Sequence, residues 1–217
     1  MTGRTVGENL DKVKQGDRRV IRSREAPLSQ DGGLIFLQGN LAPGGALIKK
    51  SAVPPAMLRH RGPARIFPTE EEACDALKRD DLKMGDVVVV RYRGPRGDPG
   101  MRLLQRFLWL LEAKGLHDRI AFLTDGRISG TNKGCAAVHI APEAAVGGPI
   151  ALIQEGDPIE IDVLGQSLTL QVSAEELAER KRKWVAPKGK VIKGYLAIYA
   201  RNAKSAEDGA GLDYGGG

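Results

Sequence analysis

The chain has 217 residues, of which 41% are hydrophobic and 28% charged, and its formal net charge is +6 at pH 7. These values are typical of a folded globular domain and exclude a disordered, collagen-like or disulfide-rich chain. Its only cysteines, Cys74 and Cys135, lie far apart and outside any Cys/His cluster, so no cysteine-rich metal site is indicated.

Charge and hydropathy also limit the partners that we expect. The longest apolar run, 107–111, is far too short to cross a bilayer, so we expect a cytoplasmic protein without membrane contact. Basic residues are scattered, and their one real cluster, 180–183, ends a predicted helix, where cations are favourable. Aromatic residues are sparse at 5%. We therefore expect the positive charge to attract an anionic small molecule and not a nucleic acid.

The first part of the chain predicts an arm followed by strands. Residues 1–31 are polar and weakly patterned, with a short helix around 7–14. Strand-like runs separated by Gly, Pro, Asn and Asp follow at 34–37, 46–48 and 87–92. The run Val87–Val90 is continuously apolar and β-branched, which is typical of a strand covered on both faces.

Helix signals alternate with these strands. Thr69 with Glu72, and Ser173 with Glu176, each form the sequence signature of a capping box. A wide apolar face predicts a helix over 101–114, and Pro142 opens a short helix that ends at Gly147.

The last part of the chain predicts a hairpin and a tail. Strand-like alternation over 158–163 and 167–172 indicates a hairpin, and the Gly-rich residues 202–217 predict a disordered tail. The order of these elements favours a mixed α/β fold, with a mixed sheet or barrel over 32–201 and flanking helices.

One polar loop stands out as a candidate site. An apolar run ends at Leu123, and a Gly-rich turn then presents Ser129 before the chain becomes apolar again at Cys135. Glycines at 126 and 130 would allow close approach, and Arg127 could pair with a carboxylate. The alternative is an ordinary turn, in which Asp125 makes a local hydrogen bond and Ser129 caps the next element. The residues alone leave both interpretations open.

Other chemistry-bearing residues have simpler explanations. His139 lies in an apolar run and fits a packed histidine better than a base. His60 and His117 lie in polar segments without partners. Cys74 and Cys135 fit core positions, because iron–sulfur ligation needs several thiolates.

Several ordered motifs resemble the dihydroxy-acid dehydratase and phosphogluconate dehydratase family. The match runs from about Thr2 to Tyr199 and covers about the C-terminal third of a typical family member. Its motifs are Gly39–Ala46, Arg61–Phe67, Arg93–Met101, Thr124–Gly130, His139–Ala145 and Gly147–Leu152.

The resemblance implies a β-barrel-like swivelling domain and the dehydration of a dihydroxy acid or sugar acid to a 2-keto acid. It gives Ser129 the role of the proton-abstracting base, and it places Asp125, Gly126, Arg127, Gly130 and Thr131 at the substrate. Thr131 is similar to the sugar-acid branch. A complete family enzyme uses an iron–sulfur cluster and Mg²⁺, which act as Lewis acids.

The chain departs from the family in two ways. The cluster ligands and part of the metal site belong to an N-terminal domain outside this sequence. Leu103 occupies the position of a family glutamate that binds Mg²⁺, and leucine has no oxygen to coordinate a hard cation. We therefore expect no cofactor in this chain and no activity from the chain alone.

Three functions remain as expectations. The first is a domain or subunit of a hydro-lyase that needs a cluster-bearing partner and forms a homo-oligomer. The second is a non-catalytic module that binds sugar acids and has lost the metal site. The third, a nucleic-acid-binding protein, rests on charge alone.

Overall fold

The computed structural model describes residues 2–14, 16–188 and 193–213, and the chain divides into two units, residues 1–33 and 34–217. Among its described residues, the first unit contains one helix, α1 (Val6–Leu10), which is shorter than the predicted 7–14. Its N-terminus is held by a capping box, with Thr5 N 2.7 Å from Glu8 Oε2 and Glu8 N 3.3 Å from Thr5 Oγ1. No residue of α1 is buried, so packing does not extend the helix further.

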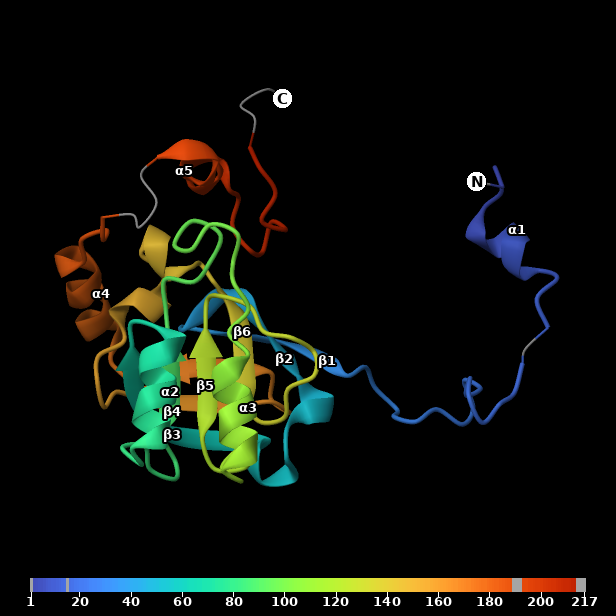
Figure 1. The fold of residues 1–217 in the computed structure, drawn as a ribbon, viewed down its shortest axis with the longest axis horizontal. Helices are drawn as coiled ribbons and strands as arrows, with labels where there is room; N and C mark the ends of the chain where they lie inside the picture. The colour runs from blue at the N-terminus through green and yellow to red at the C-terminus, as the bar shows by residue number, and fades with distance from the viewer. Residues whose placement is uncertain (1, 15, 189–192, 214–217) are drawn as a thin grey trace. The chain divides into compact units, whose positions relative to one another are not determined.

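The second unit is a closed eight-stranded barrel with flanking helices, as the sequence predicted (Figure 1). Around the barrel the strands follow the order β1-β2-β6-β5-β4-β3-β7-β8. Their bounds are β1 Leu34–Gly39, β2 Ala42–Lys49, β3 Arg59–Phe67, β4 Val87–Val90, β5 Ala121–Thr124, β6 Ala136–Ala141, β7 Pro158–Asp162 and β8 Ser167–Leu170.

The barrel has a parallel half and a mainly antiparallel half. Strands β3, β4, β5 and β6 run parallel to one another, so their carboxyl ends meet at one edge. In the other half, β7 and β8 form the predicted hairpin, in which Asp162 pairs with Ser167. The edge formed by parallel carboxyl ends is where open α/β sheets bind ligands, so the loops that follow these four strands are the first place to look for a site.

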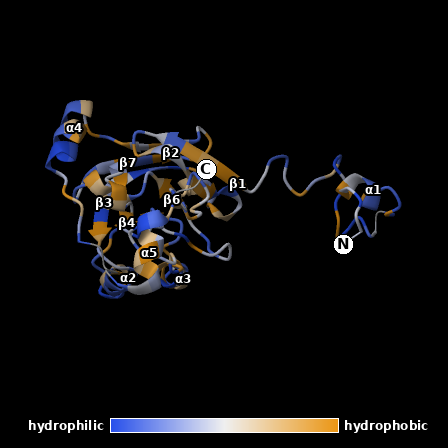
Figure 2. Cartoon of the chain, turned by 90° about the horizontal axis from the view of Figure 1, so that it is seen from above, coloured by the Kyte–Doolittle hydropathy of each residue, from blue (hydrophilic) through white to orange (hydrophobic). Residues whose placement is uncertain are grey.

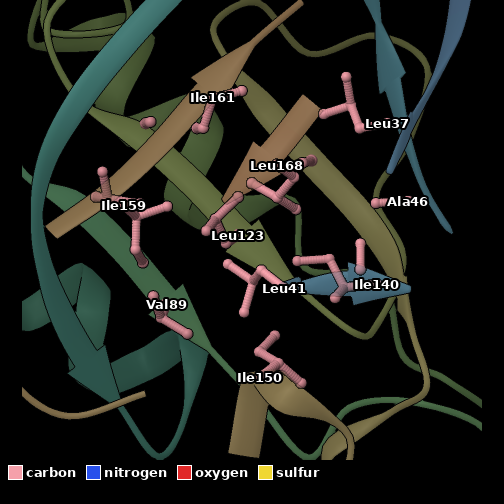
Figure 3. Packing of buried hydrophobic residues seen from close by; sticks show 14 of the residues in the cluster. Leu37, Leu41, Ala46, Val89, Leu123, Ile140, Ile150, Ile159, Ile161 and Leu168 are labelled. Atoms are coloured by element: carbon pink, nitrogen blue, oxygen red, sulfur yellow. The ribbon is translucent and has the colours of Figure 1, made fainter. Parts of the chain in front are cut away.

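The core lies on both faces of the parallel half. Inside the barrel, Val89 and Leu123 meet Ile159 and Leu168 from the hairpin (Figure 3). On the outer face, Val88 and its neighbours pack under α2 (Glu70–Lys78) and α3 (Arg106–Ala113). The prediction that the run Val87–Val90 is covered on both faces is therefore confirmed.

The helix predicted over 101–114 begins later than its apolar pattern indicates. Leu103 forms a parallel bridge with Arg127, and Leu104 N donates to Arg127 O at 3.0 Å. These contacts keep residues 103–104 extended, and α3 starts only at Arg106. The predicted start at Met101 is wrong because pairing with a distant loop overrides local helix propensity.

The remaining helices surround the barrel. Both predicted capping residues hold their helices, with Glu72 N 3.1 Å from Thr69 Oγ1 and Glu176 N 3.1 Å from Ser173 Oγ. In Figure 2, α4 is coloured mostly hydrophilic, whereas β1 is coloured mostly hydrophobic. The other elements are α4 Ala174–Lys183, α5 Gly194–Asn202 and four 3-10 turns, η1 Lys50–Ala52, η2 Pro55–Met57, η3 Ala144–Val146 and η4 Pro149–Leu152.

The tail predicted over residues 202–217 is described only as far as residue 213. Ala203 pairs with Leu212 in an isolated bridge, and residues 214–217 lie outside the described part of the chain. The predicted bounds of arm, domain and tail stay predictions. Among the residues that the structure describes, no helix has both the length and the apolar character needed to cross a bilayer.

Candidate active site

Asp125 joins three loops at the carboxyl edge of the parallel strands. It follows β5 and is fully buried. Its carboxylate accepts from Tyr92 N (3.1 Å) and Arg93 N (2.9 Å) after β4, and from Ala144 N (2.8 Å) after β6. Burial raises the pKa of Asp125, and these hydrogen bonds act in the opposite direction. The family resemblance placed Asp125 at the substrate, and that role stays a prediction; in the structure its oxygens accept from three main-chain amides.

Gly126 lets two of these loops approach closely. An added Cβ would lie 2.7 Å from Arg93 Cβ, closer than carbon atoms normally come. The Gly126 main chain is bonded on both sides, with Gly126 N 2.9 Å from Thr124 Oγ1 and His139 N 2.9 Å from Gly126 O. Gly126 is therefore buried, and its lack of a side chain allows this close packing of the loop.

This close approach gives a testable prediction. We expect Gly126→Ala to lower the free energy of unfolding by about 2 kcal/mol, because overpacking a filled site costs roughly 1–3 kcal/mol. Gly130→Ala is the matched control, since its Cβ would meet nothing within 4 Å and should change stability by less than about 0.5 kcal/mol. Urea unfolding of both variants measures the difference. Equal stabilities would contradict the tight contact at Gly126.

The next part of the loop, from Arg127 to Thr131, reaches the surface. Arg127, Gly130 and Thr131 are exposed, and Ser129 is half-buried. Ser129 Oγ lies 3.3 Å from Thr131 Oγ1. The main chain is anchored from both sides, because Ser129 N donates to Gln105 Oε1 at 2.8 Å and Lys49 Nζ donates to Gly130 O. The structure thus brings together four of the predicted residues where a ligand can reach them.

The histidine and the two cysteines that the sequence singled out as packed residues are at least partly buried. His139 is half-buried, and both burial and the charge of Arg127 lower its pKa, which favours the neutral ring. Cys74 and Cys135 are buried free thiols. Burial raises the pKa of Cys74 to about 11 and that of Cys135 to about 12, so neither is a thiolate at neutral pH.

Two buried polar residues at this edge were missed by sequence reasoning. The sequence placed Gln105 inside a predicted helix and Glu143 in a short predicted helix that starts at Pro142. In the structure, that short helix is the 3-10 turn Ala144–Val146, and Glu143 precedes it. Glu143 accepts from Arg96 N and Gly97 N, each at 2.9 Å, and so orders the loop after β4. No sequence spacing signals either contact, since both partners are main-chain groups of distant loops.

The described residues do not fit the metal groups that the family resemblance implies. Leu103, at the glutamate position, is 48% exposed beside Arg127 and offers no oxygen. Within residues 2–14, 16–188 and 193–213, no three His, Cys, Asp or Glu side chains gather in a way that could hold a metal ion.

Comparisons with known proteins identify the family of this chain. The chain is 49% identical to the dihydroxy-acid dehydratase of Moorella thermoacetica over 213 residues, which is 98% of the chain and 39% of that protein. It is 50% identical over 97% of its length to the dihydroxy-acid dehydratase of Carboxydothermus hydrogenoformans and 46% identical to that of Ruminiclostridium cellulolyticum, covering 38% of each. The chain thus spans less than two fifths of the curated relatives it matches. Residues 19–210 match the dihydroxy-acid/6-phosphogluconate dehydratase C-terminal family, and the chain belongs to this family.

Proposed function

We propose that this chain forms one wall of a dehydratase site that converts a dihydroxy acid or sugar acid to a 2-keto acid. The observation that carries the proposal is the anchored loop 127–131, which presents Ser129 at the carboxyl edge of the parallel strands. Family membership supports the hydro-lyase chemistry. Relatives named as dihydroxy-acid dehydratases favour a dihydroxy acid, whereas Thr131 favoured a sugar acid.

In this proposal, Ser129 removes the proton next to the substrate carboxylate. A serine is a poor base unless positive charge stabilises its alkoxide. Arg127 and Lys49 bring such charge to the loop, since both side chains bond main-chain carbonyls in or beside it. Arg127 pairs with the substrate carboxylate, Gly130 and Thr131 line its path, and Asp125 and Gly126 hold the loop in place.

The rest of the site comes from a cluster-bearing domain or subunit. The length of the relatives beyond the matched region supports this part of the proposal. We place the assembly in the cytoplasm as a homo-oligomer, with no nucleic acid or membrane as partner. A bound iron–sulfur cluster and Mg²⁺ would supply Lewis-acid chemistry there.

A second function is favoured by Leu103. A chain whose surface lacks the family's metal-binding oxygen could bind sugar acids without catalysis. In that case the exposed part of the loop would recognise an acid through Arg127, and Ser129 would donate a hydrogen bond only.

Coexpression distinguishes the two functions. The chain would be produced with the part of the Moorella thermoacetica enzyme that lies outside the match, and each part would be produced alone as a control. We expect a stable complex that forms a 2-keto acid from a 2,3-dihydroxy acid, with no product from either part alone. Binding of sugar acids by the chain alone, with no product from the complex, would support the non-catalytic module instead.

A further inference from the structure

The side chain of Gln105 serves the Ser129 loop and not its own helix. Gln105 is the N-cap residue of α3, a position that usually directs its side chain to the first helical amides. It makes no such bond. The amide of Phe107 is bound by Glu70 Oε1 at 3.0 Å instead, which leaves Gln105 Oε1 for Ser129 N at 2.8 Å.

The hydrogen bond between Gln105 and Ser129 extends a short row of contacts between residues 101–105 and the loop 127–131. Leu104 N donates to Arg127 O, Leu103 bridges Arg127, and the Arg127 side chain bonds Met101 O. The main-chain oxygen of Gln105 accepts from Trp109 N at 3.1 Å inside α3. The side-chain oxygen of Gln105 takes over at the point where the main-chain carbonyl is used by the helix.

Burial makes this bond a firm anchor. Gln105 is only 5% exposed, so water competes weakly for its amide. Its Nε2 is buried without a hydrogen-bond partner among the described residues, and such a group costs free energy. Methionine or leucine would fill the same space without that cost, so the acceptor oxygen is the feature that distinguishes glutamine here.

We propose that Gln105 is a positioning residue that fixes the main chain at Ser129 and thereby aims the Ser129 hydroxyl at the substrate. This inference rests on the proposed role of Ser129. In the described part of the chain, the one hydrogen bond that reaches Ser129 from outside its loop comes from Gln105. Its other two bonds are to Thr131, whose side chain is exposed.

Amide hydrogen exchange of the 217-residue chain tests the anchor without any assay of activity. In Gln105→Met we expect the Ser129 amide to exchange about tenfold faster, because one hydrogen bond is worth roughly a factor of ten. Gln105→Glu keeps an acceptor oxygen and should stay near the original rate. Gln171→Met, at an exposed glutamine that bonds Glu160, is the matched control and should leave the Ser129 amide unchanged.

A second variant, with a shorter side chain, keeps the test decisive. If circular dichroism shows that Gln105→Met does not fold, Gln105→Asn retains the amide but lacks the reach, and it should give the same faster exchange. Unchanged exchange at Ser129 in the folded variant would overturn the proposal. So would a uniform increase across the barrel strands, which would indicate general destabilisation.

Kinetic measurements on Gln105 and Ser129 variants test this inference and the proposed function separately. In the dehydratase complex, Gln105→Met should lower kcat on the order of 10²-fold with little change in KM, since small misplacement of a catalytic group has such effects. Full activity after Ser129→Ala would overturn the base while leaving the exchange result intact. An unchanged exchange rate would overturn the role of Gln105 while leaving Ser129 in place.

Discussion

Replacing Ser129 by Ala in a dehydratase complex that contains this chain should lower kcat by about 10³-fold, because a positioned general base contributes roughly 10²–10⁴-fold. The change removes only the hydroxyl. The main-chain amide of Ser129 still donates to Gln105, so the loop keeps its anchor and KM should change little. The rate of 2-keto acid formation at saturating substrate measures the effect.

Two further variants isolate the hydroxyl of Ser129. Thr131→Val removes the neighbouring hydroxyl, 3.3 Å away, and should cost far less than the loss of the base. Ser51→Ala, at an exposed serine in η1, controls for loss of a surface hydroxyl and should leave kcat unchanged. If the Ser129→Ala complex works within about twofold of the unchanged complex, another group removes the proton and the assignment is wrong.

Several strands and helix starts were predictable because their signals are local and periodic, whereas the choice of a barrel over an open mixed sheet came from the family resemblance. The apolar run Val87–Val90 and the alternation on either side of residues 164–166 each reflect which faces of a strand are buried. Both capping residues are likewise local, since each bonds an amide three residues away. Closure into a barrel follows once these strands bury their apolar sides together.

The start of α3 and the supports of the site were not predictable in the same way. Residues 101–105 carry a helical apolar pattern, yet they pair with a loop more than 20 residues away. Gln105 and Glu143 bond main-chain amides, and any residue provides such a donor, so no sequence motif marks the contact. Ser129 was found because Gly and polar residues gather around it, whereas its anchors are single residues in apolar or turn segments.

Asp125 shows how the same motif can carry two roles. Beside Ser129 in sequence, it was predicted to contact substrate, and the structure buries it under the loops after β4 and β6. A buried carboxylate at a strand end can accept hydrogen bonds from several main-chain amides at once. A carboxylate that faces a substrate has fewer of its lone pairs free for such bonds. Within five residues, the motif therefore contains a buried structural anchor, Asp125, and the half-buried Ser129.

Replacing Asp125 by Ala should lower the free energy of unfolding on the order of 4 kcal/mol, since each buried donor left unpaired costs roughly 1–3 kcal/mol. Three amides at 2.8–3.1 Å lose their acceptor together, in a position without solvent exposure. Urea unfolding measures the loss, and Asp118→Ala, at a partly exposed aspartate paired with Arg119, is the matched control.

The Asn variant separates shape from charge at the same position. Asp125→Asn keeps one acceptor oxygen but turns an amide N–H group toward main-chain donors, so it should fall between the original chain and Asp125→Ala. Domains of this kind are stable by only about 5–15 kcal/mol, so a loss of 4 kcal/mol would loosen all three loops at the site. A loss below about 1 kcal/mol in Asp125→Ala would mean that water replaces the carboxylate. The loop of Ser129 would then depend on Gln105 and Lys49 for its position, and not on the buried carboxylate of Asp125.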